Sequence, residues 1–368
     1  TPIGPARPDN VVDDGSRRPA EIRATADRHG ATLVVLPANA GPAAARNAGL
    51  RLVGTPYVVF VDSDVVLPPD TVPLLLRHFT DPRVGMAVPR ITGLRTAAAS
   101  GWLGRYEAAR SSLDLGAEPA VVRPRTPVSW ASTACCVTRV DAMADGFDEG
   151  MRVGEDVDLC WRLDRGGWRI RYEPEVHAEH EHRVRLGDWL RRKAEYGTGA
   201  HPLAERHPDL VAPAVLAPWA SALSLALLAQ RRWSLPVAGA VWGLATLRIA
   251  GKLKGTRHPV PLATRLTAGG AVGAVSQTGA LLTRHWWPLA ALGCAVSPRM
   301  RRAVAVAALA DVALEYRPGR LGLDPLRYAV ARRLDDLAYG SGVWYSAVKG
   351  RGTASLRPRL WSRNKSSR

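Results

Sequence analysis

The fold is decided by the stretch Tyr57-Val58-Val59-Phe60-Val61-Asp62-Ser63-Asp64. Its first five residues are aromatic or β-branched, and Thr55-Pro56 and Pro68-Pro69 bound it on either side. A short apolar run between turn signals predicts a central strand of an α/β sheet. Two carboxylates stand at the carboxyl end of that strand, where open α/β sheets bind their ligands. The stretch therefore predicts a buried strand that ends in a ligand-binding turn.

The Asp62-Ser63-Asp64 turn has the chemistry of a divalent-metal site. Hard oxygen ligands suit Mg²⁺ or Mn²⁺, and such a pair would hold the ion jointly with a substrate diphosphate. A solvated turn is the alternative, because this triplet is common in turns. The residues around it decide between the two interpretations.

The composition separates the chain into two halves. The 368 residues are 46% hydrophobic, which suffices for two domains with sizeable cores. Residues 1–212 carry a net charge of −1 and residues 213–368 carry +18, so the second half favours an anionic membrane surface or nucleic acid. The four cysteines show no metal-ligand spacing and no disulfide framework, which indicates a reducing, cytosolic environment. The chain opens on Thr1 without a signal segment, so we expect it to start inside a longer protein.

Two turns before this strand also carry polar residues. The first, Asp13-Asp14-Gly15-Ser16, ends a predicted strand, and its carboxylates can accept the imide hydrogen of a uracil ring; a plain strand-to-helix turn explains it equally well. The second, Asn39-Ala40-Gly41, precedes an alanine-rich helix that carries Arg46 and Asn47. An arginine on a helix is commonly a solvated residue, but its place just before the central strand favours a nucleotide contact.

A second concentration of acids opens a predicted helix after Gly154. Glu155, Asp156 and Asp158 fall in its first turn, where the helix dipole alone favours acids. A carboxylate at a helix start beside a bound sugar can also serve as a general base, and Asp156 is the candidate. Small residues at 129–137 predict a strand that a ligand can approach closely.

Histidines and arginines follow the last predicted strand. His177, His180 and His182 lie within six residues, but no Cys or His pair elsewhere completes a structural zinc site. A role for His180 or His182 beside Asp64, as a further ligand of the same metal, is the better interpretation. The basic run that starts at Arg183 can neutralise phosphate, or it can form a solvated helix face.

Together these residues resemble the GT-A glycosyltransferases of family 2. The resemblance rests on the order and spacing of four motifs: Asp13-Asp14-Gly15-Ser16, Asn39-Ala40-Gly41 with Ala45-Arg46-Asn47-Ala48-Gly49, Asp62-Ser63-Asp64, and the run from Gly154 to Arg162. It covers about residues 9–205 and implies a mixed sheet flanked by helices, a nucleotide-diphospho-sugar donor, a divalent metal and inversion at the anomeric carbon. The family's first strand is absent before Thr1, and we expect truncation to account for this.

The resemblance implies that one set of residues binds the nucleotide. Asp13 or Asp14 reads the uracil together with Arg46, and Asn47 belongs to the same substrate-binding set. Asp62 contacts the ribose and the metal.

A second set handles the diphosphate and the metal. Asp64 binds the metal directly and so bridges to the donor diphosphate, and His180 or His182 completes the shell. Arg183 touches the leaving diphosphate. The ion that the resemblance implies is Mn²⁺ or Mg²⁺.

A third set acts on the acceptor. Asp156 takes the proton from the attacking hydroxyl, and Glu155 and Trp161 help to bind substrate. A narrower resemblance, over residues 179–200 and 331–344, is to glycosyltransferases that extend a glucose chain on a peptide-derived redox cofactor. It implies UDP-glucose as the donor and a small peptide-derived acceptor.

The second half of the chain contains two long apolar stretches. Residues 211–229 carry no charge, and residues 233–250 carry none until Arg248. Nineteen uncharged residues approach the roughly 20 that span a bilayer, and basic flanks favour the cytosolic side. A soluble bundle of alanine-rich helices is the alternative.

The sequence therefore predicts three regions: a GT-A domain at residues 1–205, an apolar helical region at 206–316, and a basic segment at 317–368 whose residues 351–368 are disordered. It predicts an inverting, metal-dependent glycosyltransferase whose catalytic domain lies at the cytoplasmic face of the cell membrane. The alternatives are a lipid-linked or cell-wall acceptor, a non-catalytic sugar sensor, and a nucleic-acid-binding protein. The last lacks a recognised motif, and we expect no nucleic-acid partner.

Overall fold

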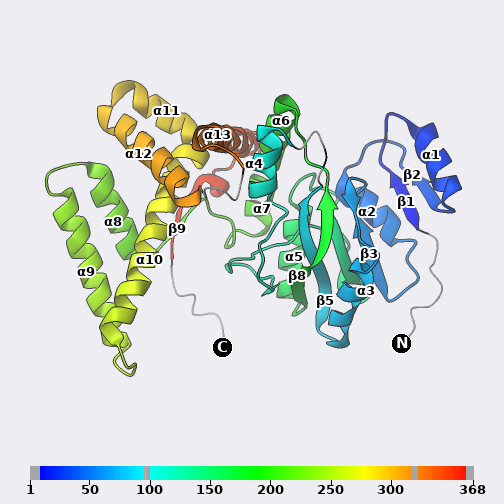
Figure 1. The fold of residues 1–368 in the computed structure, drawn as a ribbon, viewed down its shortest axis with the longest axis horizontal. Helices are drawn as coiled ribbons and strands as arrows, with labels where there is room; N and C mark the ends of the chain where they lie inside the picture. The colour runs from blue at the N-terminus through cyan, green and yellow to red at the C-terminus, as the bar shows by residue number, and fades with distance from the viewer. Residues whose placement is uncertain (1–8, 95, 97–99, 317–321, 362–368) are drawn as a thin grey trace. The chain divides into compact units, whose positions relative to one another are not determined.

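The computed structural model describes residues 9–94, 96, 100–316 and 322–361 (Figure 1). The chain forms two compact units, Thr1–Val184 and Arg185–Arg368. Each unit has hydrophobic clusters of its own. The boundary near residue 205, which was drawn from the motifs, stays a prediction.

The first unit is built on a mixed six-stranded sheet. Its strands are β3 (Tyr57–Val61), β4 (Val65–Val66), β5 (Val84–Gly93), β6 (Ala120–Val121), β7 (Cys135–Arg139) and β8 (Arg169–His180). They follow the order β3-β7-β5-β8-β4, with β6 paired to β8, and only the β5–β8 pair is parallel. Two further strands, β1 (Asn10–Asp13) and β2 (Thr32–Val35), form a separate parallel pair. The predicted mixed sheet is confirmed.

Helices flank both sets of strands. Helices α1 (Pro19–Arg28) and α2 (Pro42–Leu50) contact the β1–β2 pair, whereas α3 (Thr71–Leu76), α4 (Trp102–Arg110) and α5 (Glu155–Arg165) contact the six-stranded sheet. Leu75 of α3 is fully buried and packs with Phe79 against Val84 and Val137 of the sheet. Burying such a side chain contributes about 1.5–3 kcal/mol, so this contact fixes α3 on the sheet.

The predicted strand at residues 57–61 is present, but its central position is wrong. β3 lies at the edge of the main sheet and, among the described strands, pairs only with β7. Val58 and Phe60 are buried, whereas Val59 and Val61 are exposed. An edge strand with one covered face needs apolar residues only at alternate positions. β3 has apolar residues at every position, and this pattern led to the prediction of a central strand.

Two other strands differ from their predicted extents. The strand expected at residues 129–137 begins only at Cys135, because residues 129–134 form a loop in which the Ser132 hydroxyl accepts a hydrogen bond from the Ala134 amide. The last strand does not end near Tyr172 but continues to His180. It does so because β5 pairs with it through a register shift at Pro89 and Arg90.

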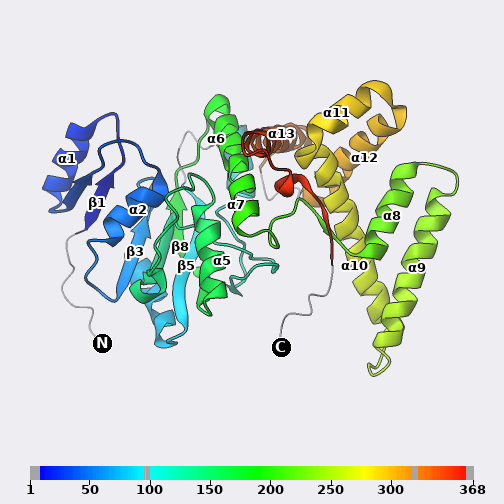
Figure 2. The same cartoon turned by 180° about the vertical axis from the view of Figure 1, so that it is seen from behind.

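The second unit is helical. Its helices are α6 (Leu186–Thr198), α7 (Ala200–Arg206), α8 (Pro218–Ala229), α9 (Ser234–Lys252), α10 (Pro259–Ala280), α11 (Trp287–Val296), α12 (Pro298–Glu315) and α13 (Pro325–Lys349). A π-helical turn, η4 (Leu281–His285), joins α10 to α11. Figure 2 shows α8 and α9 side by side, with α10 next to them. Among the described residues, only α9 is long and apolar enough to cross a membrane, by length and composition alone.

Two predictions for this unit are wrong. The uncharged stretch at residues 211–229 is not one helix, because Val215–Leu216 forms the short strand β9 and α8 begins only at Pro218, a residue that a helix accepts in its first turn. The predicted disorder does not extend over residues 351–361, where β10 (Arg359–Leu360) pairs with β9. Residues 362–368 lie outside the described part of the chain.

Glycines allow α13 to pack directly on its neighbours. A Cβ atom at Gly342 would overlap the carbonyl oxygen of Ala194 on α6, and one at Gly340 would overlap the carbonyl oxygen of Arg284. Buried ion pairs hold the same helices, since the Asp336 carboxylate lies 2.9 Å from an Arg284 nitrogen. The close approach of backbones therefore explains the glycines of this segment.

We expect Gly342→Ala to destabilise the protein by about 1–3 kcal/mol, because the added methyl group must displace backbone. Gly243→Ala on α9 is the control: a Cβ there meets no atom within 4 Å, and alanine favours a helix. Chemical denaturation monitored by circular dichroism measures both. Equal stabilities of the two variants would contradict the packing described here.

Candidate active site

The start of α5 carries three acids, of which Glu155 and Asp158 are buried. Gly154 precedes the helix with a φ of 86°, a left-handed conformation that residues with side chains rarely adopt. The Asp158 carboxylate is fully buried and pairs with the Arg162 Nε at 2.8 Å, so it serves the core. Glu155 and Asp156 remain for chemistry at the helix start.

Arg46 joins this helix start to the end of β3. One guanidinium nitrogen lies 2.7 Å from the Asp62 Oδ1 and another lies 2.8 Å from the Glu155 Oε1. The guanidinium also stacks on the Phe147 ring at 5.5 Å, and only 12% of the side chain is exposed. The structure thus brings together Arg46, Asp62 and Glu155, which belong to three separate motifs of the sequence.

Asp156 has the electrostatics of a base that works near neutrality. Burial and, next, the negative charge of Glu155 raise its pKa to about 7, although Arg46 acts in the opposite direction. Its Oδ1 accepts a hydrogen bond from the Val157 amide at 2.8 Å, which fixes the carboxylate at the helix start. A carboxylate with its pKa in this range can both take up and release a proton at physiological pH.

Asp64 faces a histidine across the β4–β8 pair. Val65 lies opposite His180, and the His180 Nε2 is 3.3 Å from the Asp64 Oδ2. This hydrogen bond, more than any other cause, lowers the pKa of Asp64, and the positive charge of the exposed Arg183 contributes. Asp64 is therefore ionised at neutral pH and open to a cation.

The metal set that the sequence predicts is only partly gathered. In residues 9–94, 96, 100–316 and 322–361, no three His, Cys, Asp or Glu side chains converge as a metal site. Asp62 is engaged by Arg46, and the buried His182 ring lies against Gly93. Asp64 and His180 are the pair that comes together, and His180 has a buried Nδ1 without a hydrogen-bond partner in the described part.

The first turn motif serves partly to hold loops together. Both carboxylate oxygens of Asp14 accept backbone amides, from Ala40 at 2.6 Å and from Gly41 at 2.8 Å. Asp13 is buried and accepts the Ser16 amide at 2.9 Å, and hydrogen bonds from the Ser16 side chain and from this amide lower the pKa of Asp13. Asp14 thus connects the turn after β1 to the loop before α2, whereas Asp13 closes the turn itself.

Two predicted substrate-binding residues have structural partners. The Asn47 amide group donates to the Phe147 carbonyl at 2.9 Å and accepts from the Phe147 amide at 2.8 Å, so it holds the loop that carries this ring. The Trp161 side chain is buried and donates to the Ser129 carbonyl at 2.9 Å. A direct role for either residue in substrate binding stays a prediction.

Arg152 is a residue of this region that sequence reasoning missed. Its guanidinium donates to the Asn39 Oδ1 at 2.7 Å and to the Asn39 carbonyl at 2.9 Å. It therefore connects the loop before α5 to the loop before α2. Its place two residues before Gly154 is the sequence signal that could have identified it.

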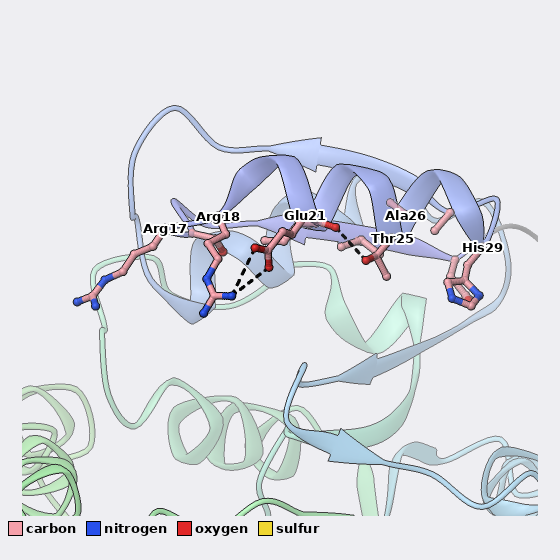
Figure 3. A pocket seen from close by; sticks show the side chains of 11 residues that line it. Arg17, Arg18, Glu21, Thr25, Ala26 and His29 are labelled. Carbon is pink, nitrogen blue, oxygen red and sulfur yellow. Dashed lines mark hydrogen bonds and ion pairs between the residues drawn. The ribbon is translucent and has the colours of Figure 1, made fainter.

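A pocket of about 620 Å³ lies apart from these residues, along α1 and β1. Figure 3 shows Arg17, Arg18, Glu21 and Thr25 along it, with the Arg18–Glu21 ion pair at the helix start. The lining includes none of the predicted catalytic or metal-binding residues.

The family described as Glycosyl transferase family 2 matches residues 10–125 of this chain. A protein called pre-mycofactocin glycosyltransferase, from two strains of Mycobacterium tuberculosis (CDC 1551 / Oshkosh and ATCC 25618 / H37Rv), is 42% identical over 95% of this chain and 76% of its own length. The chain belongs to glycosyl transferase family 2. It is therefore a glycosyltransferase with a GT-A fold, and the family and the narrower resemblance predicted from the sequence are confirmed.

More distant relatives of this glycosyltransferase match less of the chain. An N-acetylglucosaminyltransferase of Rhizobium sp. (strain N33) is 26% identical over 50% of the chain and 44% of its own length. Among solved structures, a mannosyltransferase from Pyrobaculum calidifontis in complex with GDP-Man and Mn²⁺ is 20% identical over 73% of the chain and 76% of its own, with a TM-score of 0.39.

Proposed function

We propose that this glycosyltransferase moves a glucose unit from UDP-glucose, with inversion, to a hydroxyl group of pre-mycofactocin. The acceptor follows the name of the relative that is 42% identical. The observation that carries the proposal is the Arg46 bridge, because it joins Asp62, at the predicted donor end, to Glu155, which adjoins the candidate base Asp156. Donor and acceptor chemistry then share one site.

The reaction needs one base. The acceptor oxygen attacks the anomeric carbon while the bond from that carbon to the diphosphate oxygen breaks, and the diphosphate leaves with the electron pair. Asp156 takes the proton that the acceptor hydroxyl loses. Attack on the face opposite the leaving group inverts the anomeric carbon. Arg46 holds Glu155 beside Asp156. The negative charge of Glu155 raises the pKa of Asp156, so that Asp156 can accept the proton.

The donor end uses the other predicted residues. Both Asp14 oxygens already accept backbone amides, which favours Asp13 for the uracil. Arg183 lies close enough to Asp64 to lower its pKa, which supports a role at the diphosphate.

The Asp64–His180 pair fits Mn²⁺ or Mg²⁺, because Asp64 is ionised and an imidazole nitrogen lies beside it. Asp62 and the donor diphosphate would supply further oxygens. Such an ion, when bound, lowers the negative charge on the leaving diphosphate.

We also propose that the catalytic domain works at the cytoplasmic face of the cell membrane. Residues 213–368 carry a net charge of +18, and α9 has the length and composition of a membrane helix. Anionic lipids attract such a basic region. The α9 helix alone is weak support, and the charge carries this part of the proposal.

The proposed transfer can be measured with purified protein and a peptide-derived acceptor. The donors to compare are UDP-glucose, UDP-galactose, GDP-mannose and dTDP-rhamnose. We expect turnover of UDP-glucose, an anomeric configuration opposite to that of the donor, and loss of turnover in EDTA.

Asp64→Asn should raise the metal concentration needed for half-maximal turnover by at least about 10–100-fold. Loss of a residue that only supports a metal ligand already weakens metal binding by this much. Asp70→Asn is the matched control, because its carboxylate is exposed and caps no backbone amide. Turnover that EDTA and Asp64→Asn leave unchanged would exclude the proposed metal site. Turnover of another donor alone would correct the sugar.

A further inference from the structure

Helices α11 and α12 of the second unit leave large apolar side chains exposed. Leu289, Leu292 and Val296 of α11 follow the spacing of one helix face, and between 53% and 84% of each is exposed. Val306 and Leu309 of α12 are 65% and 71% exposed. Large apolar side chains exposed on two helices that pack on each other can form a surface that binds a membrane or another protein.

The described residues of the second unit cover these helices only in part. None of the 18 residues of α12 is buried, and Ala290 is the buried residue of α11. The two helices pack on each other, and α12 also contacts α10 (Figures 1 and 2). We call the exposed side chains of Leu289, Leu292, Val296, Val306 and Leu309 the α11–α12 face.

The charge around this face selects its partner. Residues 210–310 contain eleven Arg and Lys residues and no Asp or Glu. Arg299, Arg301 and Arg302 lie exposed in the first turn of α12, next to the apolar side chains. Phosphate head groups complement such a rim. A second copy of this chain would instead bring two positively charged surfaces together.

The dimensions of the helices favour a position in the plane of the membrane. The 10 residues of α11 extend about 15 Å, roughly half the hydrocarbon thickness of a bilayer. On α12, Asp311 forms an ion pair with Arg332 of α13 at 2.9 Å, so the second half of α12 is held to the protein by a charged contact. A helix too short to span the bilayer can bury exposed apolar side chains in the head-group region while neighbouring basic side chains stay at the lipid phosphates.

We propose that the α11–α12 face binds an anionic phospholipid surface, with its apolar side chains inserted at the interface and with Arg299 and Arg302 on lipid phosphates. The inference rests on the proposed membrane attachment of the enzyme and assigns that attachment to one surface and one lipid class. The glycosyltransfer site contributes none of these residues, so binding and turnover can be measured separately.

Flotation of the full chain with vesicles tests this proposal. Vesicles of phosphatidylcholine alone are compared with vesicles that also contain phosphatidylglycerol. We expect binding to the anionic vesicles only, about five-fold weaker for Arg299→Gln and again for Arg302→Gln. Leu292→Glu should abolish it. Leu326→Glu is the control, because Leu326 on α13 is equally exposed but lies outside the face.

Several outcomes would overturn the proposal. One is equal binding to both vesicle types, and another is unchanged vesicle binding of Leu292→Glu. A third is that the protein is a dimer, and that Leu292→Glu dissociates the dimer but leaves flotation unchanged. Resistance of bound protein to an alkaline carbonate wash would replace in-plane binding with a spanning helix. Sugar transfer to a soluble acceptor, measured on the same samples, should be equal in all variants. Normal transfer without vesicle binding would refute the lipid surface alone, and vesicle binding without transfer would refute the proposed reaction alone.

Discussion

Asp156→Asn should lower kcat by about 10²–10⁴-fold, because an amide cannot accept the proton of the attacking hydroxyl. The pH profile gives a second readout. A carboxyl with its pKa raised to about 7 is protonated below that pH and cannot act as a base, so wild-type kcat should fall as the pH decreases through 7. The residual activity of Asp156→Asn should lack this acidic limb. Steady-state kinetics between about pH 5.5 and 8.5 cover the range in which such a group titrates, and they measure both effects.

Asp164→Asn is the matched control for Asp156. It lies near the end of the same helix, and its carboxylate pairs at 3.0 Å with Arg123, which is mostly exposed. Surface pairs contribute about 0–1 kcal/mol, so this variant should keep its stability and its kcat. Full activity of Asp156→Asn, with the acidic limb retained, would assign the base to another residue.

Arg46→Ala should have the second large effect, because it leaves two neighbouring carboxylates without their shared cation. Removal of one partner of a buried ion pair costs about 3–5 kcal/mol, and we expect the lower end because 39% of the Asp62 side chain is exposed. Arg46 now lowers the pKa of Asp156, so its loss should shift the acidic limb of the kcat profile to higher pH. Arg46→Lys should restore only part of the activity, since an ammonium group cannot bridge Asp62 and Glu155 as a guanidinium does.

The same variants decide between two roles for Arg46. If Arg46 reads the uracil, as the family resemblance implies, Arg46→Ala raises KM for the donor and changes kcat little. If it positions Asp62 and Glu155, kcat decreases. The acidic limb moves in both cases, because the charge of Arg46 acts on the pKa of Asp156 whatever else Arg46 binds. Arg51→Ala is the control, because this exposed arginine follows the same helix and lies 3.8 Å from Glu149. Thermal unfolding of all three variants separates a loss of stability from a loss of chemistry.

The sequence predicted which segments meet at the site but not how their side chains pair. Asp62 follows a strand and Glu155 opens a helix, and such ends gather at one edge of an α/β sheet whatever the details of packing. The Arg46 bridge could not be predicted, because it depends on the Phe147 ring that directs the guanidinium. Asn47 was assigned to substrate for the same reason: the sequence does not show that the Phe147 backbone uses its amide group.

The extent of β8 was predictable from a pattern that the histidines obscured. Val176 and Ala178 are buried, whereas His177 and Glu179 alternate with them and face away from the core. This two-residue period is the signature of a strand with one covered face. The interrupted apolar stretch at 211–229 is different: pairing of β9 with β10, more than 140 residues later, is a long-range contact that no local pattern reveals.

The contact between α6 and α13 limits how this enzyme can be divided. Lys193 of α6 is buried, and its ammonium lies 3.7 Å from the Asp335 carboxylate on α13. A fragment that ended near residue 205 would keep α6 but lose this carboxylate and the glycine surface on which the helix rests. Its exposed apolar and cationic groups would favour aggregation over a working minimal domain. Helix α13 is therefore needed in any fragment that keeps α6.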